Sequence, residues 1–208
     1  RAAGSAMFKI GKTIAIAAVQ GPRALYPQAF QDPKCGILRC NYNMMAFSGS
    51  GDRVRPGPSR RSKEISLVTE KALLPVLDLT GFAGSVVDVY IELIQTDAGT
   101  RCAGITAAAM ALADAGLPMK ELVSAVSAGK VGGKIVLDLS KEEEDYEGGA
   151  TDIPVAMSTR NGQVTLLQLD GEITKAELRK ALELAKEGCA KIRELQIKAL
   201  KEKYGVKK

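Results

Sequence analysis

Residues 85–95 show the clearest alternation of apolar and polar side chains in the chain. The apolar members, which would share one face of an extended strand, are Val87, Val89, Ile91 and Leu93. The polar members, which would share the other face, are Asp88, Tyr90 and Glu92. This period of two predicts a strand with one buried face. Residues 5–21 predict a hairpin around a Gly11-Lys12 turn, and its second strand is expected to end at residues 21–23. Residues 36–43 predict a further strand.

Helical periodicity appears in three segments. The apolar positions of residues 60–77 recur every three or four residues, which predicts an amphipathic helix. An alanine-rich run over residues 102–116 predicts a second helix that ends at Gly116. Thr174 and Glu177 form a capping-box pattern at the start of a long final helix.

The second half of the chain adds further strands. Residues 122–131 and 134–139 flank Gly132-Gly133 and predict a hairpin, and residues 153–158 and 164–170 predict another through Asn161-Gly162. This order of elements indicates an α/β or α+β domain. We assign the chain to the α+β class, sandwich-like with mixed sheets, and expect a single domain over residues 1–208. Because the chain begins at Arg1 without a methionine, we expect a further segment to precede it.

The turn over residues 95–101, Gln-Thr-Asp-Ala-Gly-Thr-Arg, joins the strand at 85–95 to the alanine-rich helix. The first N–H groups of a helix have no internal partner, and the helix dipole adds partial positive charge there. With Gly99, the hydroxyl of Thr100 and the cation of Arg101, this turn suits an anion, above all phosphate. The alternative is an ordinary capped helix start.

A polar segment over residues 48–62 carries four arginines against one acid, Asp52. Arg60 and Arg61 fall in the first turn of the predicted helix, where the dipole disfavours cations. Their position suggests an anionic ligand, and the alternative is a solvated basic loop end.

An acidic run over residues 142–152 precedes the strand at 153–158. Its early carboxylates are expected in a solvated loop, whereas Asp152 lies at the start of an apolar strand. Burial there would raise the pKa of Asp152 and let it act as a general acid. Asp145 lies seven positions earlier across a Gly-Gly turn, so Asp145 and Asp152 could together bind a divalent cation. The alternative for each acid is a plain solvated charge.

The composition limits the chemistry. The 208 residues include no histidine, so catalytic triads and His-metal sites are excluded within this chain. Net charge is +5, which favours an anionic partner. No apolar run reaches about 20 residues, so no membrane span is expected. The four cysteines, Cys35, Cys40, Cys102 and Cys189, fit neither a zinc site nor a disulfide framework, which suggests free thiols in the cytoplasm.

These features together suit cleavage of a phosphodiester. Inorganic phosphate is already anionic, so it could serve as nucleophile without a histidine base, and an acid would protonate the departing oxygen.

Five short motifs occur in an order that resembles the RNase PH family, and within it the catalytic ring subunits of archaeal exosomes. The motifs are Gly4-Ser5-Ala6, Pro58-Ser59-Arg60-Arg61, Gln95-Thr96-Asp97-Ala98-Gly99-Thr100-Arg101, Ala111-Leu112-Ala113-Asp114-Ala115-Gly116 and Thr151-Asp152-Ile153-Pro154-Val155-Ala156. The resemblance covers essentially the whole chain. It implies a single RNase PH-type domain with a βαβ arrangement, and a phosphorolytic 3′-to-5′ exoribonuclease that releases nucleoside 5′-diphosphates.

The resemblance also implies roles for individual residues. The family's phosphate-binding turn falls on Gly99, Thr100 and Arg101, with inorganic phosphate as co-substrate, and its RNA-backbone arginines fall on Arg60 and Arg61. Its catalytic aspartate falls on Asp152. Its second, metal-associated acid falls on Asp145, with Mg²⁺ as the expected ion.

The implied partners are the 3′ end of single-stranded RNA, a related inactive subunit that alternates in a hexameric ring, and RNA-binding cap proteins. Gln28 and Ala29 stand where relatives often carry a basic residue and a histidine, and the interval from Asp145 to Asp152 is one residue longer than usual. Two alternatives stay open: a non-catalytic scaffold subunit that guides RNA, and a bacterial-type homohexamer that trims transfer-RNA 3′ ends.

Overall fold

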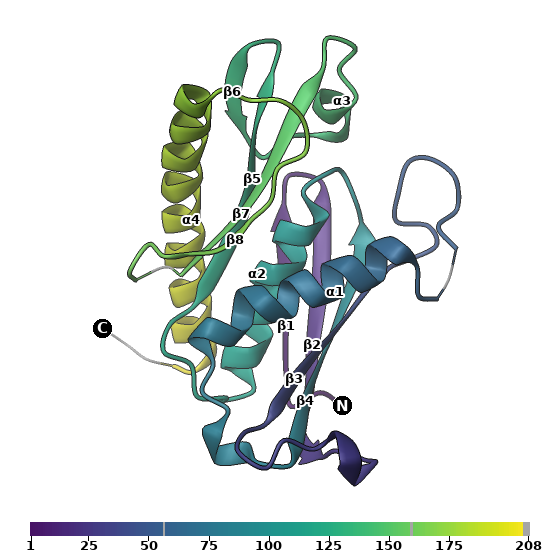
Figure 1. Cartoon of the computed structure of the whole chain (residues 1–208), viewed down its shortest axis with the longest axis vertical. Helices are drawn as coiled ribbons and strands as arrows, with labels where there is room; N and C mark the ends of the chain where they lie inside the picture. The colour runs from purple at the N-terminus through teal and green to yellow at the C-terminus, as the bar shows by residue number, and fades with distance from the viewer. Residues whose placement is uncertain (56, 159, 206–208) are drawn as a thin grey trace.

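The computed structural model describes residues 1–55, 57–158 and 160–205. Within these residues the strands form two four-stranded sheets (Figure 1). The first sheet has the order β1-β2-β4-β3 and consists of β1 (Gly4–Ile10), β2 (Thr13–Ala24), β4 (Ser85–Gln95) and β3 (Ile37–Met44). The second has the order β6-β5-β7-β8 and consists of β6 (Lys134–Leu137), β5 (Val123–Val131), β7 (Ala150–Ser158) and β8 (Val164–Leu167). Among the strands of the described residues, only the β3–β4 pair is parallel.

Four α-helices accompany the sheets in the described part of the chain. They are α1 (Arg60–Leu73), α2 (Thr100–Asp114), the short α3 (Lys141–Glu144) and α4 (Lys175–Lys203). The same described residues include three single 3₁₀ turns: η1 (Gln28–Phe30), η2 (Leu74–Val76) and η3 (Thr80–Phe82). No helix in these described residues is both long and apolar enough to span a membrane.

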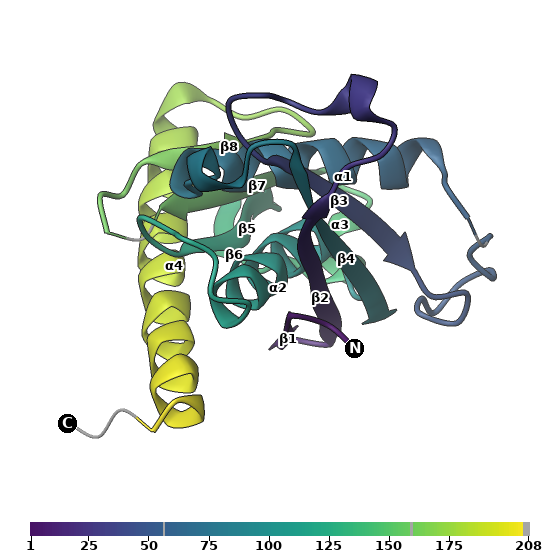
Figure 2. The same ribbon diagram turned by 90° about the horizontal axis from the view of Figure 1, so that it is seen from below.

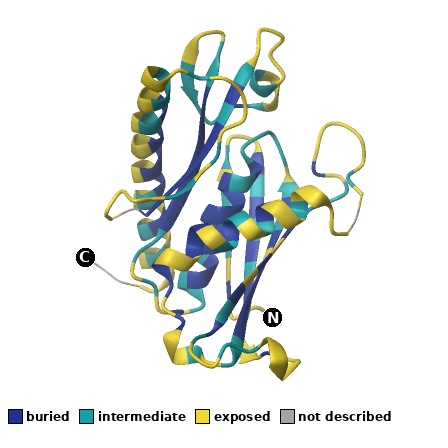
Figure 3. Ribbon diagram, in the orientation of Figure 1, coloured by how far each residue is buried: buried dark blue, intermediate teal, exposed yellow. Residues whose placement is uncertain are grey.

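Helix α2 lies between the two sheets and is buried over most of its length (Figure 3). Its alanines and Gly104 keep the helix thin, so both sheets can approach it closely. A Cβ on Gly4 of β1 would lie 2.2 Å from the backbone nitrogen of Ala115, just after α2, which shows how close this strand lies. A single apolar cluster therefore runs from the first sheet through α2 to Val123, Ala125 and Ala156 of the second.

The other face of the second sheet packs against α4, which runs along one side of the molecule (Figures 1 and 2). Ala181, Ala185, Cys189 and Ile192 supply the buried stripe of this helix. Thr174 caps it with Glu177 as the pattern predicts. At its far end, Asp114 of α2 binds Lys203 and the hydroxyl of Tyr204.

The predicted α+β class, the hairpins and the long C-terminal helix are confirmed. All four cysteines are free thiols, as expected. Three details of the pattern were wrong. Strand β2 does not break at residues 21–23 but continues to Ala24, because an irregularity between Gln20 and Arg23 lets it pass Pro22, which has no N–H to donate. Helix α1 ends at Leu73 and passes into η2, whose second residue is Pro75.

The third correction concerns the start of the acidic run. Residues 141–144 form α3 rather than a plain loop, because the Ser140 side chain accepts a hydrogen bond from Glu143 N and the Glu143 carboxylate accepts one from Ser140 N. A buried carboxylate also lies on the predicted polar face of β4. Asp88 is 1% exposed and binds Arg23 at 2.6 Å and Arg39 at 2.7 Å, which hold its pKa below the ordinary value even though burial opposes them.

Candidate active site

The predicted anion turn lies where β4 leads into α2. Ala98 and Gly99 both adopt left-handed backbone angles, with φ of 58° and 54°. Thr13 fixes the turn, because its hydroxyl donates to Ala98 O and accepts from Asp97 N, both at 2.9 Å. Gly99 is the N-cap of α2 and offers no side-chain cap. The first N–H groups of α2 are therefore left without the usual capping oxygen and suit an anion.

A cavity of about 290 Å³ lies against this turn. Six of the residues singled out in the sequence line it: Arg61, Gly99, Thr100, Arg101, Asp145 and Asp152. They come from α1, the start of α2, the end of α3 and β7, so segments far apart in the sequence meet here. Arg60 does not line this cavity, although it is the immediate neighbour of Arg61.

Asp152 lies on β7, where it pairs with Gly129 of β5. Its backbone exchanges two hydrogen bonds of 2.9 Å with Asp170, which follows β8. The hydroxyl of Ser127 donates to Asp152 Oδ1. Burial raises the pKa of Asp152 above its ordinary value, while the Ser127 hydrogen bond and the charge of Arg101 oppose that rise. A carboxylic acid with a raised pKa is suited to proton donation.

Arg101 is held by two side chains from other elements. Its Nη1 donates to Gln168 Oε1 at 2.5 Å and lies 3.6 Å from Glu64 Oε1 of α1. Gln168 in turn donates to Glu64 at 3.2 Å. These contacts fix the guanidinium group at the cavity wall, with a fifth of its side chain exposed.

Asp145 is oriented differently from Asp152. Its carboxylate pairs with Lys141 at 2.6 Å and is 62% exposed. Glu144 is more enclosed, and burial together with the charge of Asp152 raises its pKa. Among the residues that the structure describes, no three His, Cys, Asp or Glu side chains form a group that could hold a metal ion.

Several residues of this site were missed in the sequence. Ser127, Lys141, Glu144, Gln168 and Asp170 reach the site only because β5, α3 and the end of β8 converge on it. The sequence predicted the strands at 122–131 and 153–158 but gave no pairing between them. The strand register that places Ser127 beside Asp152 could therefore not be predicted from the sequence.

Comparison with known proteins identifies the chain. Residues 1–118 match the family model of RNase PH, described as the 3′ exoribonuclease family, domain 1, and residues 121–188 match domain 2 of the same family.

The chain belongs to the 3′ exoribonuclease family.

Relatives within the 3′ exoribonuclease family are close in sequence. The chain is 48% identical over 205 residues to the exosome complex component Rrp41 of Methanopyrus kandleri, covering 99% of this chain and 84% of the relative. It is 53% identical over 201 residues to the Rrp41 component of Pyrococcus furiosus, covering 97% and 79%. A solved structure, the Archaeoglobus fulgidus exosome with RNA bound to the active site, has a chain that superposes with a TM-score of 0.76 at 24% identity, covering 93% and 83%. This likeness shows the fold.

Membership of the 3′ exoribonuclease family confirms the resemblance and the enzyme class that followed from it, a phosphorolytic 3′-to-5′ exoribonuclease. Inorganic phosphate is accordingly a substrate of the reaction. The roles of individual residues remain predictions, and they are argued below from the geometry of the cavity.

Proposed function

We propose that this chain is the catalytic subunit of an archaeal exosome ring and shortens RNA from its 3′ end by phosphorolysis. One observation carries the proposal: the anion turn of α2, Arg61 and the buried Asp152 line a single cavity. The relatives named as exosome components support the choice of assembly.

Inorganic phosphate would occupy the anion turn. The free N–H groups at the start of α2, the Thr100 side chain and the Arg101 guanidinium group are its proposed ligands. Since Arg101 is already fixed by Gln168 and Glu64, little side-chain freedom would be lost when phosphate binds.

The chemical step then needs one acid. A phosphate oxygen attacks the phosphorus of the last nucleotide, a new P–O bond forms, and the bond to the 3′ oxygen of the preceding nucleotide breaks. Asp152 donates its proton to that departing oxygen. The products are a nucleoside 5′-diphosphate and an RNA chain that is one nucleotide shorter.

Arg61 lines the cavity, which supports the proposal that it contacts the RNA backbone near the cleaved bond. Arg60 lies outside this cavity, so we propose that its contact is with a phosphate farther along the strand. Cations in the first turn of α1 gain nothing from the helix dipole, which fits a role toward an external anion.

Mg²⁺ is proposed as an ion held by one or two carboxylates together with substrate oxygens and water. Asp152 and Asp145 are the proposed protein ligands, and binding by Asp145 would displace Lys141 from its carboxylate. The ion would neutralise charge on the reacting phosphates. Calorimetric titration of Mg²⁺ into the wild type and into Asp145→Asn, with inorganic phosphate present, tests this without measuring activity.

The remaining partners are proposals of the same kind. We propose a paralogous inactive subunit that alternates with this chain in a hexameric ring, RNA-binding cap proteins on one face, and a cytoplasmic location. Substitutions at Arg60 and in η1, which contains Gln28 and Ala29, would test first whether RNA contacts extend beyond the cavity.

The deciding experiment is a nuclease assay on an RNA with an unstructured 3′ end. It is run with and without inorganic phosphate, on the chain alone and with its candidate partner. We expect phosphate-dependent release of nucleoside diphosphates. Asp152→Asn should abolish that release while RNA still binds, because Asp152 acts in the chemical step and in holding Mg²⁺ and not in holding the RNA backbone. Asp78→Asn is the matched control, since the Asp78 carboxylate accepts hydrogen bonds from Thr80 and does not line the cavity.

The outcomes separate the candidate functions. Full activity in Asp152→Asn would overturn the acid assignment. Release of monophosphates without added phosphate would overturn phosphorolysis. RNA binding with no degradation under any condition would favour the scaffold subunit, and a fully active ring of this chain alone would favour the bacterial-type homohexamer.

A further inference from the structure

Two buried hydroxyl groups beside the anion turn have no hydrogen-bond partner among the described residues. They are Thr100 Oγ1 and Tyr42 Oη, and each of the two residues is only 4% exposed. Buried polar groups in folded proteins nearly always have a partner. Two orphaned hydroxyls next to a proposed ligand site therefore call for a functional explanation.

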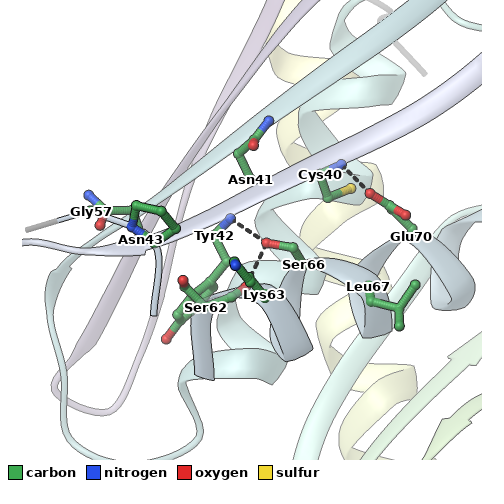
Figure 4. A pocket seen from close by; sticks show the side chains of 11 residues that line it. Cys40, Asn41, Tyr42, Asn43, Gly57, Ser62, Lys63, Ser66, Leu67 and Glu70 are labelled. Atoms are coloured by element: carbon green, nitrogen blue, oxygen red, sulfur yellow. Dashed lines mark hydrogen bonds between the residues drawn. The ribbon is translucent and has the colours of Figure 1, made fainter. Parts of the chain in front are cut away.

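Tyr42 is held rigidly from two sides. Its backbone N–H on β3 donates to Ser66 Oγ of α1 at 2.9 Å, and the neighbouring Cys40 N–H donates to Glu70 Oε1 at 2.8 Å (Figure 4). These side chains tie the outer edge of β3 to α1. The phenol ring packs against α2, because a Cβ added to Gly104 would lie 3.7 Å from Tyr42 Cδ2.

The same packing directs the ring toward Thr100. Gly104 and Thr100 are four residues apart, so they lie on one face of α2. The Tyr42 ring contacts this face at Gly104, one helical turn from Thr100. Burial raises the pKa of Tyr42, and the Thr100 hydroxyl, Arg61 and Arg101 each act against that rise. Thr100, Arg61 and Arg101 all line the anion cavity.

We propose that Tyr42 is a positioning residue of the phosphate site, whose hydroxyl donates a hydrogen bond to Thr100 Oγ1 when Thr100 donates its own proton to bound phosphate. A threonine hydroxyl has one proton to donate and two lone pairs to accept with. Tyr42 satisfies the acceptor side and leaves the single proton for the ligand. The inference rests on the proposed function, because it assigns a partner to the same phosphate site.

The test is Tyr42→Phe, which keeps the ring on Gly104 and removes only the hydroxyl. Since the hydrogen bond acts on phosphate binding, the KM for inorganic phosphate should rise about threefold to tenfold, and kcat should stay within about twofold. RNA affinity should not change. The assay uses whichever assembly of the wild-type chain is active.

Two further variants separate positioning from packing. Tyr90→Phe is the matched control, because Tyr90 is exposed on β4 and should leave the KM for phosphate unchanged. In a Thr100→Val background, Tyr42→Phe should no longer alter the KM, since Tyr42 acts only through Thr100.

Each outcome decides the question. A Tyr42→Phe enzyme whose KM for phosphate matches the wild type, or whose effect persists without the Thr100 hydroxyl, overturns the inference and leaves the proposed function intact. A wild-type enzyme that does not require phosphate overturns both.

Discussion

Gly129 is the position where one methyl group should disturb both stability and catalysis. It lies on β5 directly opposite Asp152 of β7. A Cβ at this position would lie 2.2 Å from the carbonyl oxygen of Thr151 and 2.6 Å from Leu139 Cδ1. The Leu139 side chain can turn aside, but the carbonyl belongs to the backbone of β7 and to the residue just before Asp152.

The size of the effect follows from these distances. Real Cβ atoms essentially never approach closer than 3.0 Å, so β5 and β7 must separate by about 0.8 Å at this point in Gly129→Ala. Forcing an extra methyl into a packed interior costs about 1–3 kcal/mol, and a clash with backbone belongs at the upper end. For a domain of this size, a loss of about 3 kcal/mol corresponds to a fall in Tm of about 6–12 °C. A displacement of a catalytic group approaching 1 Å costs about 100-fold in rate.

The assay compares thermal unfolding, phosphorolysis and RNA binding of Gly129→Ala with the wild type. We expect a lower Tm, a kcat reduced about 100-fold at a temperature where the variant is folded, and unchanged RNA affinity. Gly81→Ala is the matched control, because a Cβ there meets nothing within 4 Å. A Gly129→Ala enzyme with wild-type Tm and rate would refute the reasoning. A destabilised variant with full kcat would show that this pairing does not position Asp152.

Two further predictions concern charge. Arg61→Ala should reduce the slope of log RNA affinity against log salt by about 0.7, which is the value for one lost phosphate contact on a single strand. Arg60→Ala should reduce this slope by less. Equal slopes for the two variants would contradict the different placement of the two arginines. Asp114 accepts from Ser5 N and Tyr204 and pairs with half-exposed Lys203, which lowers its pKa. Its contribution is therefore present above about pH 4, the ordinary pKa, and is lost as pH falls through the lowered pKa. Asp114→Asn should lower the free energy of unfolding by about 1–2 kcal/mol at pH 7, as measured by urea titration. The difference should shrink as pH falls through the lowered pKa, and a difference that is the same at every pH would contradict this.

The local sequence pattern was enough to predict most helices and strands of the fold. Alternation over 85–95 and the capping box at Thr174 correspond directly to β4 and α4, because both signals depend on neighbouring residues alone. The exceptions depend on distant partners. Strand β2 continues past Pro22 because β4 pairs with the residues on both sides of it, and a single segment of sequence carries no record of that partner.

The residues of the site also fall into those that local sequence predicts and those that depend on distant partners. Gly99, Thr100 and Arg101 are contiguous, so their turn could be predicted, and Asp152 was identified from its position before an apolar strand. Ser127 could not be found, since its contact depends on the β5–β7 register. The two arginines were equivalent in sequence, and only the direction of α1 distinguishes Arg61 from Arg60.

The site depends on the packing of α2 as much as on its own polar residues. The anion turn belongs to the first sheet through β4, whereas Asp152 belongs to the second sheet through β7. Helix α2 separates the two sheets, and its small residues set how closely they approach. A larger side chain in the middle of α2 would move the acid away from the phosphate turn without altering either one. Gly104 illustrates the constraint, because a Cβ there would lie only 3.2 Å from Ile91 Cγ2 on β4. Catalytic geometry in this protein is therefore a property of its core, and substitutions in α2 should reduce kcat even where they touch no ligand.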